Sequence, residues 1–143
     1  MKNKKIFISG CFDILHVGHL KLLHKANSLG KKIYLGIDSD KRVKRSKGID
    51  RPINNEKDRL NMIQNLRIVK SAKIFNSDQG LINLIKKIKP DILMLGDDWK
   101  NKKIIGKDLV KTIVFFKRIN KYSSTKMINK IKKKYQSKAK NNN

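Results

Sequence analysis

The sequence predicts an α/β fold, a doubly wound, Rossmann-like parallel sheet of about five strands. Short apolar segments rich in β-branched residues alternate along the 143 residues with segments whose apolar residues repeat at helical spacing. Residues 92–95 are apolar without interruption, which is typical of a central parallel strand covered on both faces. A chain of this length forms one domain, predicted at residues 1–135. The basic tail at 136–143 is expected to be disordered.

Each element is predicted from a local pattern. Residues 4–9 are apolar and predict the first strand, and the helical stripe that follows over 17–29 ends at Gly30. The remaining patterns predict, in order, a strand at 33–37, a helix from Asn54 or Asn55 to 66, a strand at 72–75, a helix through 81–88 ended by Pro90, strands at 92–95 and 112–116, and a last helix marked by Met127, Ile131 and Tyr135.

A long basic stretch separates the second strand from the helix that follows. Residues 41–52 carry six lysines and arginines, are broken by Gly48 and are closed by Pro52. The stretch is too polar for the core and too long for a simple turn. We therefore expect a loop, either a lid or an irregular surface segment.

Charge and composition narrow the class of function. Lysine and arginine outnumber aspartate and glutamate by 36 to 11, for a formal charge of +25. Such an excess is typical of proteins that bind nucleic acid or anionic membranes. Lys, Asn and Ile are abundant throughout, however, and the few aromatic residues are not interleaved with the basic ones, so we do not expect a dedicated nucleic-acid function. The charge is instead expected to attract an anionic substrate.

The compartment follows from the cysteine count and from hydropathy. A single cysteine rules out an internal disulfide and suits a reducing environment. The sequence contains no apolar run of transmembrane length, and its first residues lead directly into a strand rather than a signal peptide. We expect a cytoplasmic protein with no membrane insertion.

Four polar clusters each follow a predicted strand. They lie at residues 10–19, 38–40, 96–99 and 118–125. In a doubly wound parallel sheet, ligands bind beyond the carboxyl ends of the strands. The four clusters should therefore meet at one edge of the sheet and form the site there.

The first cluster has the features of a phosphate site. It leads from a strand through a tight turn into a helix start, whose unpaired N–H groups favour anions. His16 and His19 lie three apart on that first turn, and Gly18 between them allows a close ligand approach. Two alternatives are a structural pair and a zinc site, because all Cys and His residues fall within 11–24. No second cluster completes a zinc site, so no protein-held metal is expected.

This cluster also carries a family resemblance. The pattern Gly10, Phe12, Asp13, His16, Gly18 and His19 resembles the N-terminal motif of nucleotidyltransferases that use H-x-G-H, and among them most closely glycerol-3-phosphate cytidylyltransferases. The resemblance implies that both imidazoles contact the triphosphate and that the residues around them bind the nucleotide. Cys11 departs from the family, which usually has Thr or Ser there, and loses a hydroxyl that could bind phosphate.

Two later motifs extend the resemblance. Gly96, Asp97, Asp98 and Trp99 resemble the Gly-Asp-Asp-Trp of the same cytidylyltransferases, which implies that the carboxylates face the nucleotide or its Mg²⁺ and that Trp99 packs near the substrates. The alternative is an acidic turn with a partly buried Trp. The other motif, which the family uses to bind the triphosphate, is matched by Arg118, Ser123, Ser124, Thr125 and Lys126, whereas Lys121 replaces the usual Gly.

The serine and threonine cluster is also a helix cap on sequence grounds alone. The basic stretch is the weakest motif, since a charge run is usually a solvated face. The family has a phosphate-binding Lys there and an Arg on the next helix. The corresponding candidates are Lys44, with Lys47 close behind it, and Arg59.

The reaction implied needs charge neutralisation rather than a base. A phosphate monoester that attacks the α-phosphorus of a nucleotide is already an anion, so the site must position two repelling anions. His16, His19, Lys44 and Arg118 are assigned to that role. The expected reaction joins CTP and glycerol 3-phosphate to give CDP-glycerol and pyrophosphate, with Mg²⁺.

Two alternatives stay open. Residues 47–54 resemble adenylyltransferases that activate heptose 1-phosphate, which would make ATP and a sugar phosphate the substrates. The other alternative is a basic, non-catalytic nucleic-acid-binding protein. Homodimerisation is implied by the resemblance alone.

Overall fold

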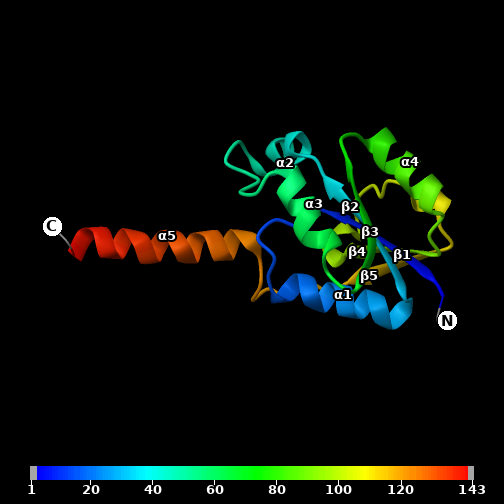
Figure 1. The fold of residues 1–143 in the computed structure, drawn as a ribbon, viewed down its shortest axis with the longest axis horizontal. Coiled ribbons are helices and arrows are strands. Elements are labelled where there is room, and N and C mark those ends of the chain that lie inside the picture. The colour runs from blue at the N-terminus through cyan, green and yellow to red at the C-terminus, as the bar shows by residue number, and fades with distance from the viewer. Residues whose placement is uncertain (1–2, 142–143) are drawn as a thin grey trace.

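The computed structural model describes residues 3–141. Strands and helices alternate along the chain (Figure 1) in the order β1 (Lys5–Gly10), α1 (Val17–Leu29), β2 (Lys32–Asp38), α2 (Asp40–Lys47), α3 (Glu56–Gln64), β3 (Val69–Phe75), α4 (Asp78–Ile88), β4 (Ile92–Gly96), β5 (Thr112–Phe116) and α5 (Ser124–Asn141). Single 3-10 turns lie at Asp97–Trp99 and Lys107–Leu109.

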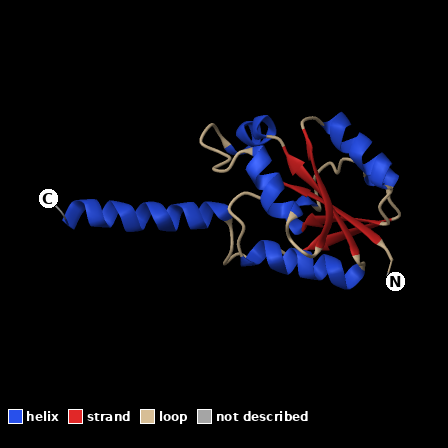
Figure 2. Ribbon diagram, in the orientation of Figure 1, coloured by secondary structure: helices blue, strands red, loops and turns tan. Residues whose placement is uncertain are grey.

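The five strands form one parallel sheet in the order β3-β2-β1-β4-β5. The chain moves outward from β1 to β3 and then returns to β4 on the other side of β1, which makes the gap between β1 and β4 the switch point of the sheet. The Rossmann-like α/β fold and the strand number predicted from the sequence are thus confirmed (Figure 2).

Apolar side chains cover both faces of the sheet. On one face Ile6 and Ile8 of β1 pack with Leu23 of α1 and Ile63 of α3. On the other face Phe7 packs with residues of α4, including Ile85. Alternate residues of β1 thus serve different cores, which is why residues 6–8 are apolar without alternation.

The basic stretch is largely helical, which corrects the expectation of a loop at 41–52. Helix α2 begins after Ser39, whose side chain accepts a hydrogen bond from the Arg42 N–H. Val43 is the one buried residue of the helix. A single apolar residue in eight gives no helical period, which is why the sequence pattern did not reveal this element. Only residues 48–55 form a connecting segment.

Helix α5 projects away from the rest of the domain (Figure 1). It continues through residues 136–141, which were expected to be disordered, while residues 142–143 lie outside the described part. Its apolar residues Met127, Ile131 and Tyr135 are exposed. The helix contains no acidic residue and seven lysines, at positions 126, 130, 132, 133, 134, 138 and 140.

Among the helices that the structure describes, none combines the length and the apolar character needed to cross a bilayer.

Candidate active site

The histidine pair stands at the start of α1, directly beyond the carboxyl end of β1. His16 is the N-cap of α1, and its Nδ1 accepts a hydrogen bond from the Gly18 N–H at 3.1 Å. His19 Nδ1 accepts from the His16 N–H, also at 3.1 Å. The two ring centroids are 3.9 Å apart. The His19 ring thus accepts the N–H of the N-cap residue, as the Glu of a capping box usually does, and the His16 ring accepts an N–H of the first turn.

These contacts fix the tautomer of both rings. A nitrogen that accepts an N–H bond cannot carry a proton of its own, so the neutral imidazoles are protonated at Nε2. In residues 3–141 neither Nε2 has a hydrogen-bond partner. The helix start thus presents two adjacent Nε2–H donors.

Burial and nearby positive charges lower the pKa of the histidine pair, so both imidazoles are neutral at neutral pH. Burial lowers the pKa of His16. Burial, followed by His16 and by the positive charges of Lys47 and Arg118, lowers the pKa of His19 to about 4, against a small opposing effect of Asp13. At neutral pH the pair acts through its Nε2–H groups, without a net charge.

Gly18 is required by packing rather than by backbone conformation. A Cβ at this position would lie 2.8 Å from the His16 ring and 3.1 Å from the Tyr122 Cβ. Any side chain would therefore push His16 away from the Gly18 N–H. At Gly10 a Cβ would meet the Phe12 ring at 3.3 Å, a milder restriction.

The turn between β1 and α1 is held by Asp13, which the sequence analysis placed among nucleotide-binding residues. Asp13 is 1% exposed. Its carboxylate accepts bonds from the Ile53 N–H at 2.6 Å and from the backbone and side-chain N–H groups of Asn54, both at 3.0 Å. The carboxylate anchors the segment after α2, and its burial favours a positioning role over contact with the ligand.

Arg59 is held within the fold in a similar way. It is also 1% exposed, and its guanidinium donates to Cys11 O at 2.7 Å, Asp40 Oδ1 at 2.8 Å and Asn54 O at 3.0 Å. All three guanidinium nitrogens are engaged, so Arg59 ties the turn between β1 and α1 to α2 and has no nitrogen left without a partner. Burial raises the pKa of the adjacent Cys11 thiol, which keeps that thiol protonated.

The cation that acts on the site from α2 is Lys47. Its charge lowers the pKa of His19 and opposes the rise in the pKa of Cys11. Lys44, the first choice from the sequence, is exposed on α2 as Lys47 is, but it is not among the charges that act on His19. Lys47 is therefore the better candidate of the two for contact with a phosphate.

The turn after β4 is joined to Arg118. The Asp98 carboxylate lies 3.3 Å from Arg118 Nε, and Asp97 Oδ1 accepts from the Arg118 N–H at 3.3 Å. A Cβ on Gly96 would lie 2.5 Å from Asp98 Oδ1, so the glycine leaves room for this carboxylate. Trp99 is 37% exposed, with Lys102 Nζ 5.3 Å from its ring centroid. Asp97 and Asp98 thus orient an arginine whose charge reaches His19.

The start of α5 completes the site. Ser123 caps the helix by accepting from the Lys126 N–H at 3.0 Å, as the sequence predicted. Ser124 donates its hydroxyl to Asp13 O at 2.5 Å. The Thr125 hydroxyl oxygen accepts from Arg51 Nη1 at 3.3 Å. The first and last clusters, more than 100 residues apart in sequence, therefore lie in direct contact.

Arg51 is the residue that sequence reasoning missed. It lies within the basic stretch, where nothing distinguishes it from five neighbouring cations. Its contact with Thr125 could not be inferred, because the contact joins two segments 74 residues apart.

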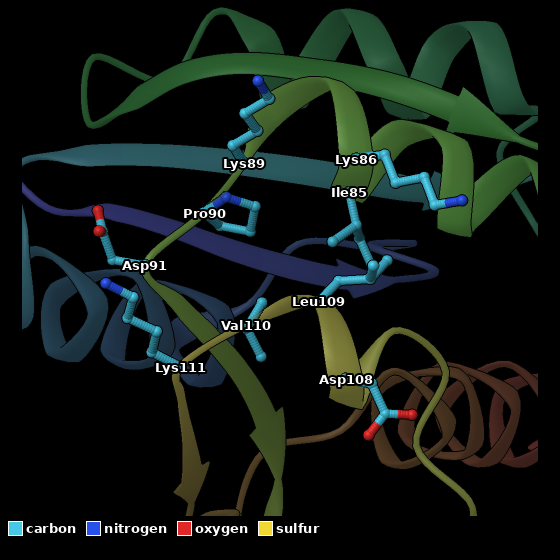
Figure 3. A pocket seen from close by; sticks show the side chains of 9 residues that line it. All are labelled: Ile85, Lys86, Lys89, Pro90, Asp91, Asp108, Leu109, Val110 and Lys111. Atoms are coloured by element: carbon cyan, nitrogen blue, oxygen red, sulfur yellow. The ribbon is translucent and has the colours of Figure 1, made fainter.

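The hollow found on the surface of the domain lies away from the histidine pair. A hollow of about 470 Å³ (Figure 3) is lined by Ile85, Pro90, Asp91, Val110 and their neighbours, which precede β4 and β5. It therefore lies at the amino ends of those strands, at the opposite edge from the histidines.

In residues 3–141 no group of three or more His, Cys, Asp or Glu side chains is placed to hold a metal ion.

Comparison with known proteins places this geometry in a family. The cytidylyltransferase-like family profile matches residues 7–132. The chain belongs to this family. The match begins within β1, covers the other four strands whole and extends into α5, so the cytidylyltransferase-like domain includes all of the site residues above.

The chain matches only part of the length of its HldE relatives. The chain is 45% identical over 131 residues to the bifunctional protein HldE of Campylobacter concisus and 42% identical over 132 residues to HldE of Helicobacter pylori. In both cases 92% of this chain matches 28% of the relative, so the chain spans little more than a quarter of these proteins. A crystal structure of the lipopolysaccharide core biosynthesis protein from Thermoplasma volcanium superposes with a TM-score of 0.66 and 26% identity, covering 81% of this chain and 98% of that one.

Proposed function

We propose that this nucleotidyltransferase is an adenylyltransferase that joins ATP and a sugar 1-phosphate, heptose 1-phosphate, to give ADP-heptose and pyrophosphate. The paired Nε2–H donors of His16 and His19 are the observation that supports nucleotidyl transfer. The choice of ATP and heptose 1-phosphate is supported by the HldE relatives, together with the resemblance at residues 47–54. CTP and glycerol 3-phosphate, the first expectation, have no comparable support among these relatives.

The chemistry requires no base. An anionic oxygen of the sugar phosphate attacks the α-phosphorus, and the bond from that phosphorus to the bridging oxygen breaks with its electron pair on the departing pyrophosphate. Both Nε2–H groups can donate to phosphate oxygens on which charge grows, and Lys47 and Arg118 add positive charge near them. Because the attacking oxygen is already an anion and pyrophosphate departs as one, the step needs no proton transfer from the imidazoles.

Mg²⁺ is proposed as a companion of the nucleotide rather than of the protein. The carboxylates of Asp97 and Asp98 contact Arg118, and Asp13 is bonded to Ile53 and Asn54, so these donors do not fit a protein-held magnesium site. Triphosphate oxygens are themselves good Mg²⁺ ligands.

Pyrophosphate release tests the proposal. ATP, CTP, GTP and UTP are each offered with heptose 1-phosphate, glycerol 3-phosphate and other sugar and polyol phosphates. We expect release only with ATP and heptose 1-phosphate. Release with CTP and glycerol 3-phosphate would show the first expectation to be right and this proposal wrong.

A second measurement separates the enzyme from a nucleic-acid-binding protein. Nucleic-acid binding through the +25 charge would be tight, strongly salt-dependent and unaffected by His16→Ala. The enzyme proposal requires loss of turnover in His16→Ala. His24→Ala, which changes an exposed residue of α1, is the matched control.

A further inference from the structure

Arg51 is buried with most of its hydrogen-bonding capacity unused. The residue lies in the segment between α2 and α3, and its side chain is 11% exposed. Nη1 donates to Thr125 Oγ1 at 3.3 Å. Nε and Nη2 are fully buried and have no hydrogen-bond partner in the part of the chain that the structure describes. Buried N–H groups are almost always paired in folded proteins, so these two call for an explanation.

The unpaired atoms form one edge of the guanidinium. Nε–H and an Nη2–H point the same way and bind two oxygens of a carboxylate or phosphate together. The nearest carboxylate does not fill this role, because Asp13 Oδ2 is 4.0 Å from Nε, too far for a hydrogen bond.

Asp13 takes its hydrogen bonds from other donors. Its two oxygens already accept three N–H groups from Ile53 and Asn54. Arg51 therefore lies beside this buried carboxylate as a positive charge, 4.0 Å away, without donating a hydrogen bond to it. Its two contacts, to Thr125 and Asp13, are both long, so the side chain loses little by turning toward another anion.

The surroundings indicate what that anion is. Thr125 belongs to the first turn of α5, and Ser124 beside it is bonded to the backbone of the phosphate turn. The charge of Arg51 also acts on Cys11 in that turn. The arginine thus stands where the first cluster and the start of α5 meet.

We propose that Arg51 and Thr125 form a phosphate subsite, in which the Nε/Nη2 edge binds two oxygens of a substrate phosphate. The inference rests on the proposed function, since it takes the anion to be a phosphate of the nucleotide or of the acceptor. Both sources share the same chemistry, and kinetics distinguishes them.

The test compares Arg51→Gln with Arg45→Gln. Arg45 is an exposed residue of α2, so its substitution removes the same charge without touching the subsite. We expect Arg51→Gln to raise one KM by about 10- to 100-fold, the loss associated with charged hydrogen bonds, while Arg45→Gln does not. A rise in the KM for ATP assigns the subsite to the nucleotide, and a rise for the sugar phosphate assigns it to the acceptor. Arg51→Lys, which keeps the charge but not the two-donor edge, should restore only part of the affinity.

Stability separates binding from a structural role. A guanidinium with unpaired buried donors contributes little to the fold, so we expect Arg51→Gln to melt no lower than Arg45→Gln. Unchanged KM values with a clear fall in melting temperature would overturn the proposal.

Calorimetric titration with inorganic pyrophosphate gives a readout that does not need turnover. Weaker pyrophosphate binding by Arg51→Gln than by Arg45→Gln supports the subsite even if heptose 1-phosphate proves to be the wrong acceptor. Equal binding by the two variants, together with equal KM values, overturns the subsite and leaves the proposed reaction standing.

Discussion

Replacing His16 by asparagine separates the two roles of this side chain. The ring caps α1 through Nδ1 and is proposed to bind phosphate through Nε2–H. Asparagine is among the best N-caps, and its side-chain oxygen can accept the Gly18 N–H as Nδ1 does, but it has nothing in the place of Nε2. Alanine has neither group. The two variants therefore share the catalytic defect and differ in the structural one.

The magnitudes follow from these contacts. His16→Ala should lose about 0.5–2 kcal/mol of the free energy of unfolding, the usual cost of a lost cap, whereas His16→Asn should lose close to none. Both should lose about 10²–10³-fold in kcat, as when one donor to a developing charge is removed. Urea unfolding and pyrophosphate release measure the two quantities. Full activity in His16→Asn would refute the role of Nε2–H, and equal stability of both variants would refute the cap.

Three further predictions concern neighbouring residues. Because His19 is neutral in the fold with a pKa of about 4, the stability it contributes is present above its unfolded pKa of about 6.5 and is lost as pH falls from there toward 4. Urea unfolding at several pH values should therefore show a smaller loss in His19→Gln than in the parent. Lys47→Ala should reduce kcat/KM well below that of Lys44→Ala, and equal values would show that the charge acting on His19 is not used. Arg59→Met should lower the free energy of unfolding by about 3–5 kcal/mol, because Asp40 and two carbonyl groups lose their donor. A thermal melt within a degree or two of the parent would contradict that structural role.

The pattern of apolar residues predicted the sheet, but it did not predict helices that bury few apolar side chains. Residues 92–95 are apolar throughout and could be placed at the centre of the sheet from sequence alone. Helix α2 buries only Val43, so its eight residues look like a charged loop. The length of α5 was underestimated for the same reason, since the residues after Tyr135 show no apolar period.

The site was predicted in outline and misjudged in detail. The position of the histidines after a strand was visible, because residue type, spacing and the expected helix start agreed. Asp13 and Arg59 were expected to face the ligand because they match positions of the family's motifs, whereas the structure buries both. Their partners come from other segments, such as Asp40 for Arg59, and no local pattern reveals that pairing.

The lysines of α5 repel one another, and this repulsion affects how much of the segment is helical. Lys126, Lys130, Lys134 and Lys138 follow one another at intervals of four, so they form a ladder of like charges on one face of the helix. Each such pair disfavours the helix by about 0.2–0.5 kcal/mol at low ionic strength. Added salt screens this repulsion, so the outer turns should gain helicity as ionic strength rises, while the first turn, fixed by Ser123 and Ser124, should respond least.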